Sequence, residues 1–244
     1  MRRAVFWGTW GLLTAISLGC VPPAQAEVFR PPPETINAVQ NQYRYSLRSR
    51  CPACSGGGLG LVYLLLPETI AATAHPYPTL YWYTPTLGEN KITVNLYHAV
   101  EDEAGNESLT PLYQTTYVIS GEPGIASLPL SADTGMPPLS VGERYHWEVL
   151  FFCEPDSCSA ELMAYGWLQR VDVDETLQHQ LATLPLSEQV LVAAEAGLWF
   201  EATHALAALL RQQPDDPELQ RRWIELLGSV GLESLAGEPF LPSG

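Results

Sequence analysis

The most informative segment of the chain reads LSVGERYHWEVLFF and spans residues 139–152. Tyr145, Trp147 and Val149 fall on one face of an extended chain, and this alternation is typical of a half-buried β-strand. Leu139 precedes Tyr145 by six residues. Immunoglobulin-like and fibronectin-like sandwiches place a corner tyrosine at the start of the penultimate strand, where its hydroxyl bonds to upstream backbone. We therefore predict that Tyr145 is a corner tyrosine.

Further strands are predicted on both sides of this segment. Ile92, Val94 and Leu96 repeat the period-2 pattern. Other strand candidates, separated by turns rich in proline and glycine, are residues 59–66, 79–84, 112–119, 125–130 and 162–171. About seven short strands of this kind favour two packed sheets over a single parallel sheet. We predict a mostly β protein with an α-helical tail, in which residues 59–172 form an immunoglobulin-like or fibronectin-like β-sandwich.

The pattern changes to a helical one over residues 173–235. Apolar side chains there recur at intervals of three and four residues, as on the buried face of a helix. Asp174, Ser187 and Asp216 are placed to cap three of the expected helices, because their short oxygen-bearing side chains accept bonds from free backbone N–H groups. Residues 236–244 are predicted to be a flexible C-terminus.

Part of this tail resembles a tetratricopeptide repeat. Gly197, Ala202 and the closing Pro-Asp-Asp of residues 214–216 follow the spacing of that repeat, although Leu209 stands where alanine is preferred. The segment holds about one and a half repeats, whereas a stable solenoid needs about three. We therefore expect the tail to lean on the sandwich or on a partner, as either a docking groove or a helical cap on the sheet.

Residues 1–26 are predicted to be an export signal. Arg2 and Arg3 precede an uncharged apolar run over residues 4–19, and Ala-Gln-Ala at residues 24–26 matches a cleavage motif. Cys20 offers lipid attachment as an alternative. The apolar run is short for a bilayer span, so no transmembrane span is expected in the mature chain. We predict a periplasmic or extracellular protein.

After the signal, residues 27–58 are predicted to be a disordered tether containing proline, arginine and glycine. Four cysteines then remain: Cys51, Cys54, Cys153 and Cys158. An even number in an exported protein favours disulfides, with the pairing left open. A bond from the tether to Cys153 would close a loop of about 100 residues and stabilise the fold by roughly 4–5 kcal/mol. Zinc ligation and a Cys-x-x-Cys redox site remain alternatives.

The charge balance restricts the possible partners. The chain has 12 basic and 27 acidic side chains, for a net charge of −15. Such a surface repels nucleic acid and anionic lipid headgroups, so we expect no nucleic-acid partner.

The sequence contains no recognisable catalytic motif. The five histidines lie outside metal and nucleophile motifs, and no phosphate-binding loop or Gly-x-Ser-x-Gly elbow is present. The acidic segment 101–107 lacks the spaced ligands of a calcium loop. We therefore expect no catalytic residue, no metal site and no cofactor. The alternative is a carbohydrate-active protein or other hydrolase, in which Glu148 and Glu161 would work as a pair on adjacent strands.

Several short segments together resemble a cyanobacterial family of exported proteins known as domain of unknown function 928. The similarity is carried by residues 63–67, 78–83, 113–115, 123–128, 139–147, 153–156, 166–171 and 197–202. This resemblance implies export and a shared fold over about residues 51–235. It implies no mechanism, because the family has no established activity.

Two interaction-type folds without a catalytic motif predict a non-enzymatic binding or assembly module of the cell envelope or periplasm. Its partner would be an unidentified protein or envelope component, and a purely structural envelope protein is a further alternative. The candidate binding aromatics are Trp82, Tyr83, Trp199, Phe200 and Trp223. Burial in the core is the competing interpretation for each of them.

Overall fold

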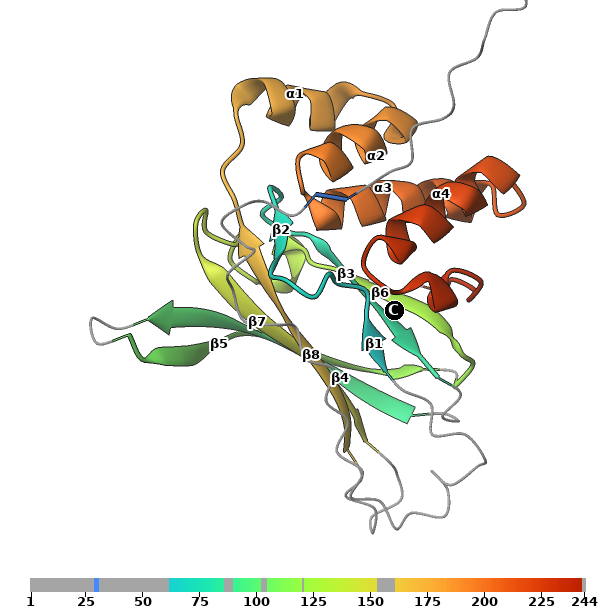
Figure 1. Ribbon diagram of the computed structural model, residues 1–244. Helices are drawn as coiled ribbons and strands as arrows, with labels where there is room; N and C mark the ends of the chain where they lie inside the picture. Colours follow the sequence, from blue (N-terminus) through green and yellow to red (C-terminus); the bar gives the residue numbers. More distant parts are fainter. Residues whose placement is uncertain are drawn as a thin grey trace, which may run out of the picture.

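The computed structural model of the chain describes residues 29–30, 62–85, 90–101, 105–119, 121–152 and 161–242. These residues form two β-sheets followed by four α-helices (Figure 1). The predicted export signal, most of the predicted tether and all four mature cysteines, Cys51, Cys54, Cys153 and Cys158, lie outside the described residues.

The first sheet has three strands in the order β1-β3-β6. Its strands are β1 (Tyr63–Leu64), β3 (Thr79–Thr84) and β6 (Gly124–Pro129). Leu80, Tyr81 and Trp82 are consecutive residues of β3, and all three are buried. A strand buried on both faces reads as a continuous apolar run rather than as an alternation. The first sheet is therefore the middle layer of the protein.

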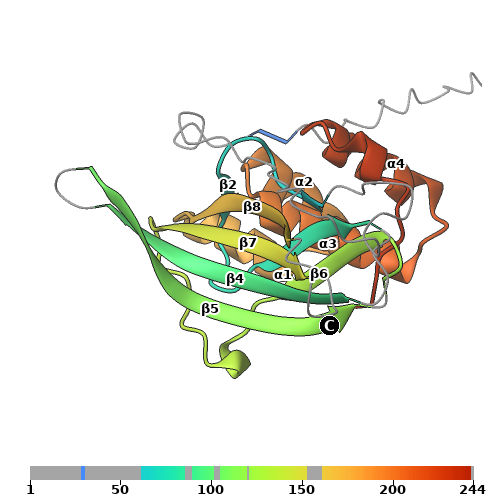
Figure 2. The same ribbon diagram turned by 90° about the horizontal axis from the view of Figure 1, so that it is seen from below.

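The second sheet has five strands in the order β2-β8-β7-β4-β5. Its strands are β2 (Ala71–Thr73), β4 (Asn90–Glu101), β5 (Glu107–Ile119), β7 (Arg144–Phe152) and β8 (Glu161–Arg170). β2 pairs in parallel with β8, and the other neighbours are antiparallel. The long β4–β5 hairpin projects beyond the rest of the sandwich (Figure 2).

The predicted alternation in this sheet is confirmed. Ile92, Val94 and Leu96 have no exposed surface, and neither do Trp147 and Val149 on the neighbouring strand β7. In the ladder, Val94 pairs with Val149 and Leu96 with Trp147, so these side chains form one inward face. That face packs in the same core cluster as β3 of the first sheet.

Four helices lie on the other side of the first sheet (Figure 1). They are α1 (Glu175–Thr183), α2 (Leu186–Glu195), α3 (Trp199–Gln212) and α4 (Pro217–Gly228). Helix α3 packs against the sheet, and α2 and α1 stack on α3 in turn. The caps predicted at Asp174 and Asp216 are confirmed, since each carboxylate accepts a backbone N–H of its helix. The cap predicted at Ser187 is wrong. Helix α2 begins at Leu186, two residues earlier than a cap at Ser187 would place it, and follows Pro185, whose fixed φ of −56° already suits a helix start.

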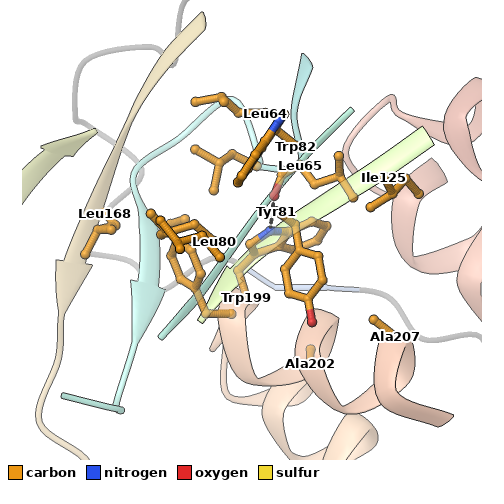
Figure 3. Packing of buried hydrophobic residues seen from close by; sticks show 14 of the residues in the cluster. Leu64, Leu65, Leu80, Tyr81, Trp82, Ile125, Leu168, Trp199, Ala202 and Ala207 are labelled. Atoms are coloured by element: carbon orange, nitrogen blue, oxygen red, sulfur yellow. Dashed lines mark hydrogen bonds between the residues drawn. The ribbon is translucent and has the colours of Figure 1, made fainter. Parts of the chain in front are cut away.

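One continuous core joins both sheets to the helices. Trp199, at the start of α3, has no exposed surface, and its indole N–H donates to the Leu65 carbonyl at 2.7 Å. Figure 3 shows this bond and places Tyr81 on the side of β3 that faces the helices. The Arg211 guanidinium lies over the Tyr81 ring at 5.7 Å and donates to the Ser127 hydroxyl at 3.0 Å. The expectation that the tail leans on the sandwich is thus met by direct packing.

The tether prediction does not hold at Phe29 and Arg30. The Phe29 side chain is 6% exposed and meets the Trp199 ring edge-on, with 5.0 Å between ring centroids. The Arg30 amide donates to the Ala194 carbonyl at 3.3 Å. Hydrophobic burial of one aromatic side chain therefore fixes this segment against the turn between α2 and α3.

The prediction of a flexible C-terminus is wrong for residues 236–242. The Ile125 amide donates to the Pro239 carbonyl at 2.7 Å, and the Leu241 amide donates to the Ile125 carbonyl at 2.8 Å. This short segment therefore lies along the outer edge of β6 and covers unpaired backbone groups there. A Cβ atom on Gly124 would lie 2.5 Å from the Pro239 oxygen, so this close approach requires glycine.

Tyr145 lies at the start of β7 with 2% of its surface exposed. Its hydroxyl accepts a hydrogen bond from the Ser140 amide at 2.7 Å. The His98 ring stacks against it at 5.2 Å. The hydroxyl thereby closes the turn that leads into β7.

We expect Phe29→Ala to lower the free energy of unfolding by about 3 kcal/mol, because it removes a buried aromatic side chain beside Trp199. Urea unfolding measures the change. Arg30→Ala is the matched control, since Arg30 is exposed and contributes its backbone amide. Equal stability of both variants would show that this segment does not anchor the tail.

We expect Tyr145→Phe to lower the free energy of unfolding by about 1 kcal/mol, because the Ser140 amide loses its acceptor, the buried Tyr145 hydroxyl. Thermal and urea unfolding report the loss. In Tyr77→Phe the deleted bond, to the Met136 carbonyl, is 3.4 Å long, so a smaller change is expected. A Tyr145→Phe protein as stable as wild type would contradict the structural role of this bond.

Candidate functional site

A pocket of about 410 Å³ opens where the helices meet the loop between β2 and β3. We call it the junction pocket. Its lining residues come from that loop, from the segment before α1 and from α1, α2 and α3: Ala74, His75, Pro76, Tyr77, Pro78, Thr79, Val173, Gln178, Leu181, Ala182, Gln189, Phe200, Glu201 and His204. The volume suits a small ligand.

The loop side of the pocket is held in place by its backbone. The Pro76 carbonyl accepts from the Leu139 amide at 3.0 Å, and the Pro78 carbonyl accepts from the Leu130 amide at 3.1 Å. Proline also fixes φ at both positions. This wall is therefore preformed rather than dependent on a ligand.

Glu201, in the first turn of α3, joins the helices to this loop. Its Oε1 accepts three hydrogen bonds: from the Thr73 hydroxyl at 2.8 Å, the Ala74 amide at 2.8 Å and the His75 amide at 2.9 Å. These donors lie 126–128 residues away in the sequence. The carboxylate is consequently fixed in orientation by the β2 end of the pocket.

The second carboxylate oxygen of Glu201 differs from the first in its hydrogen bonding. Oε2 is shielded from solvent and has no hydrogen-bond partner within the part of the chain that the structure describes. Burial raises the pKa of Glu201 and outweighs the opposing influence of the Thr73 hydroxyl and of the backbone amides of Glu201 itself, His75 and Ala74. The residue as a whole is only half-buried, but its pKa depends on the surroundings of the shielded carboxylate.

A chain of polar contacts reaches His204 on the next turn of α3. The Tyr81 hydroxyl lies 3.3 Å from His204 Nδ1 and accepts a long bond from Arg211 at 3.5 Å. Burial, followed by the Arg211 charge, lowers the pKa of His204. The neutral ring can therefore accept the Tyr81 proton at Nδ1, which leaves the hydrogen on Nε2.

Two glutamines complete the pocket from α1 and α2. Gln178 Nε2 donates to the Val173 carbonyl at 3.4 Å, and Gln189 Nε2 donates to the Leu184 carbonyl at 2.7 Å. Because the amide nitrogens are engaged with backbone, each side-chain oxygen remains available as an acceptor.

The predicted binding aromatics do not form an exposed face. Trp82, Trp199 and Trp223 are at most 2% exposed and belong to the core. Tyr83 is half-buried on β3. Phe200 is 3% exposed and is the only member of this group that lines the junction pocket. The burial of the three tryptophans agrees with the core interpretation of these residues and removes them as candidate binding residues.

The predicted carboxylate pair is separated by the strand register. Glu148 pairs with Tyr165 on β8, whereas Glu161 pairs with Phe152 on β7. The two positions are four residues apart along the ladder, roughly 13 Å at the rise of a strand. Paired glycosidase carboxyl groups lie about 5–9.5 Å apart. Glu148 instead accepts from the Asn95 amide at 2.8 Å and the Tyr97 hydroxyl at 2.9 Å.

The sequence had not singled out Glu201, His75 or His204 as site residues. The available signal was an acidic residue beside the apolar stripe that begins at Trp199. Within the described ranges, no group of three or more His, Cys, Asp or Glu side chains is arranged to hold a metal ion. The helices in the same ranges are all too short or too polar to cross a bilayer.

Comparison with known proteins places this site in a family. The family described as Domain of Unknown Function (DUF928) matches residues 41–240. The chain belongs to this family. Every residue that lines the junction pocket lies inside the matched region. No curated protein matches the chain.

We expect the stability of Glu201→Gln relative to wild type to rise as the pH increases above 4.5, the ordinary pKa of glutamate. The raised folded-state pKa means that the folded protein keeps a proton that the unfolded chain releases near its ordinary value of 4.5. The stabilisation is therefore complete below that value and is lost as the pH rises through the folded-state pKa. Glutamine does not titrate and avoids the loss.

Thermal unfolding of both proteins across this pH range measures the difference. The exposed Glu195→Gln exchange on α2 serves as the control. A difference between Glu201→Gln and wild type that stays constant with pH would contradict the burial of an ionisable Glu201.

Proposed function

We propose that the chain is a non-enzymatic binding module of the cell envelope or periplasm, and that its ligand occupies the junction pocket. The observation that carries this proposal is the Glu201 Oε2 atom, a shielded and unpartnered carboxylate oxygen of a residue that lines the pocket. Buried polar atoms in folded proteins nearly always have a partner, and each exception calls for an explanation. A ligand group supplies that missing partner.

The composition of the pocket supports binding rather than chemistry. Glu201 is the one carboxylate among the described residues that line it. Neither His75 nor His204 has its Nδ1 free, since these atoms contact Tyr77 and Tyr81. A preformed, largely apolar pocket with a few fixed polar groups is typical of small-ligand sites.

We infer an immunoglobulin-like topology for the two sheets. In the order β1-β3-β6 and β2-β8-β7-β4-β5, the first chain segment contributes a short strand to each sheet. β7 lies between β8 and β4, as the F strand lies between G and C in such domains. The bond between Tyr145 and Ser140 supports the same assignment.

We likewise infer that α2 and α3 form one tetratricopeptide-like helix pair. Gly197, with a φ of 73°, makes the turn between them, and Asp216 opens α4 as the next helix. Export to the periplasm or medium is proposed from the charge pattern of residues 1–26, and the mass of the mature protein tests it.

A fragment screen tests the binding proposal. Ala182 is exposed at the pocket, so Ala182→Trp fills the space without disturbing the core. We expect ligand-observed NMR to find small polar–apolar fragments that bind wild type and lose at least about tenfold in affinity on Ala182→Trp.

His179→Trp provides the matched control, because His179 is also exposed on α1 but does not line the pocket. Fragments should bind this variant as they bind wild type. If the fragments that bind wild type bind Ala182→Trp equally well, the junction pocket is not the binding site.

A further inference from the structure

We propose that the junction pocket binds the ammonium group of a small organic amine, with the Glu201 carboxylate as its counter-charge. This inference rests on the proposed binding function and specifies the chemical class of the ligand.

The first support is the missing counter-charge. No lysine, arginine or histidine nitrogen of the described residues forms an ion pair with Glu201. The two arginines on neighbouring elements have other acceptors. Arg170 donates to the Leu139 and Ala74 carbonyls, and Arg211 donates to Ser127 and Tyr81. A buried carboxylate without a cation is unfavourable, so a ligand cation improves on the ligand-free state.

The second support is the difference in hydrogen bonding between the two carboxylate oxygens of Glu201. Oε1 is saturated by three donors from residues 73–75, which stabilise the ionised form and prevent the group from turning away. Oε2 receives none. In the ionised form of Glu201 the unsatisfied hydrogen-bonding capacity is therefore an acceptor, and a hydrogen-bond donor on the ligand complements it and favours that form.

The third support comes from the other polar atoms of the pocket. The side-chain oxygens of Gln178 and Gln189 are left as acceptors, because their amide nitrogens donate to backbone carbonyls. An ammonium group carries three donors and no acceptor. Val173, Leu181 and Phe200 supply apolar surface for the rest of the ligand.

Helix α1 is the wall of the pocket that we expect to move when a ligand reaches the shielded oxygen. None of its residues, Glu175–Thr183, is buried, although Gln178, Leu181 and Ala182 line the pocket. Elements with little buried surface open at the lowest free energy. We infer that a small outward displacement of α1 gives the ligand access to Oε2, while the loop on the opposite wall keeps its position.

Three probes of equal chain length test the proposal: hexylamine, 1-hexanol and hexanoate. Binding to the full-length mature protein is measured by NMR titration at about 0.15 M salt, which screens the general attraction of an acidic protein for cations. We expect hexylamine to bind wild type about tenfold more tightly than 1-hexanol, and hexanoate to bind most weakly. Ala182→Trp should weaken hexylamine binding.

Variants assign the preference to Glu201. Glu201→Gln keeps the shape and the Oε1 contacts, so hexylamine should lose about tenfold in affinity while 1-hexanol is unchanged. Glu195→Gln removes the same charge from an exposed site on α2 and should leave hexylamine binding as in wild type. Gln178→Leu alters an exposed residue whose side chain makes one long bond of 3.4 Å to the Val173 carbonyl, so the variant should fold. It should weaken the affinity for hexylamine about threefold, and it tests the proposal even if Glu201→Gln fails to fold.

Two results would overturn the inference, and they differ in what they leave standing. Equal affinity of wild type for the three probes, with all of them blocked by Ala182→Trp, would refute the amine preference and keep the binding pocket. Binding of none of the probes up to about 10 mM, a range in which ligands of seven or eight heavy atoms bind suitable pockets, would refute both proposals.

Discussion

Burial of Trp199 against the first sheet is the contact on which the rest of this structure depends. The indole has no exposed surface, and its N–H is satisfied by the Leu65 carbonyl, at the end of the short strand β1. A buried tryptophan without such an acceptor would leave an unpaired donor in the core. The contact therefore fixes both the depth and the direction in which α3 starts. The first sheet, whose β3 is apolar on both faces, gains its outer cover from the same contact.

The junction pocket follows from this anchor. Glu201 lies two residues after Trp199, so the packing of the tryptophan places the carboxylate at the end of β2. There the Thr73 hydroxyl and two backbone amides meet it, and a groove remains between the loop and the shorter helices α1 and α2. One oxygen of the carboxylate thus serves the fold, and the other remains unpaired. Residues at functional sites often carry such an unfavourable feature, which the surrounding structure must offset.

The sequence predicted those features of the fold that depend on local pattern. Alternation identified β4 and β7, and short polar side chains identified the starts of α1 and α4. Local pattern failed where a distant partner decides the structure. Local pattern predicts a tether at Phe29, because nothing near it in the sequence indicates the contact with Trp199. It predicts a flexible end at residues 236–242, because the hydrogen bonds that Pro239 and Leu241 form with Ile125 of β6 are not encoded locally. The tryptophans were recognisable as large apolar residues, but only packing distinguishes a core tryptophan from a surface one.

The same reasoning explains why Glu201 could not be predicted as a site residue. On a helix, an acidic side chain next to an apolar stripe normally lies at the solvated boundary. Its burial here results from donors on β2 and the following loop, more than 120 residues away, and no helical periodicity encodes them. The carboxylate contributes to the joint between sheet and helices, and it is also the polar group a ligand in the pocket would meet. Binding at this position would therefore tighten the contact between α1 and the sandwich, because a ligand held by both walls favours the state in which they are close.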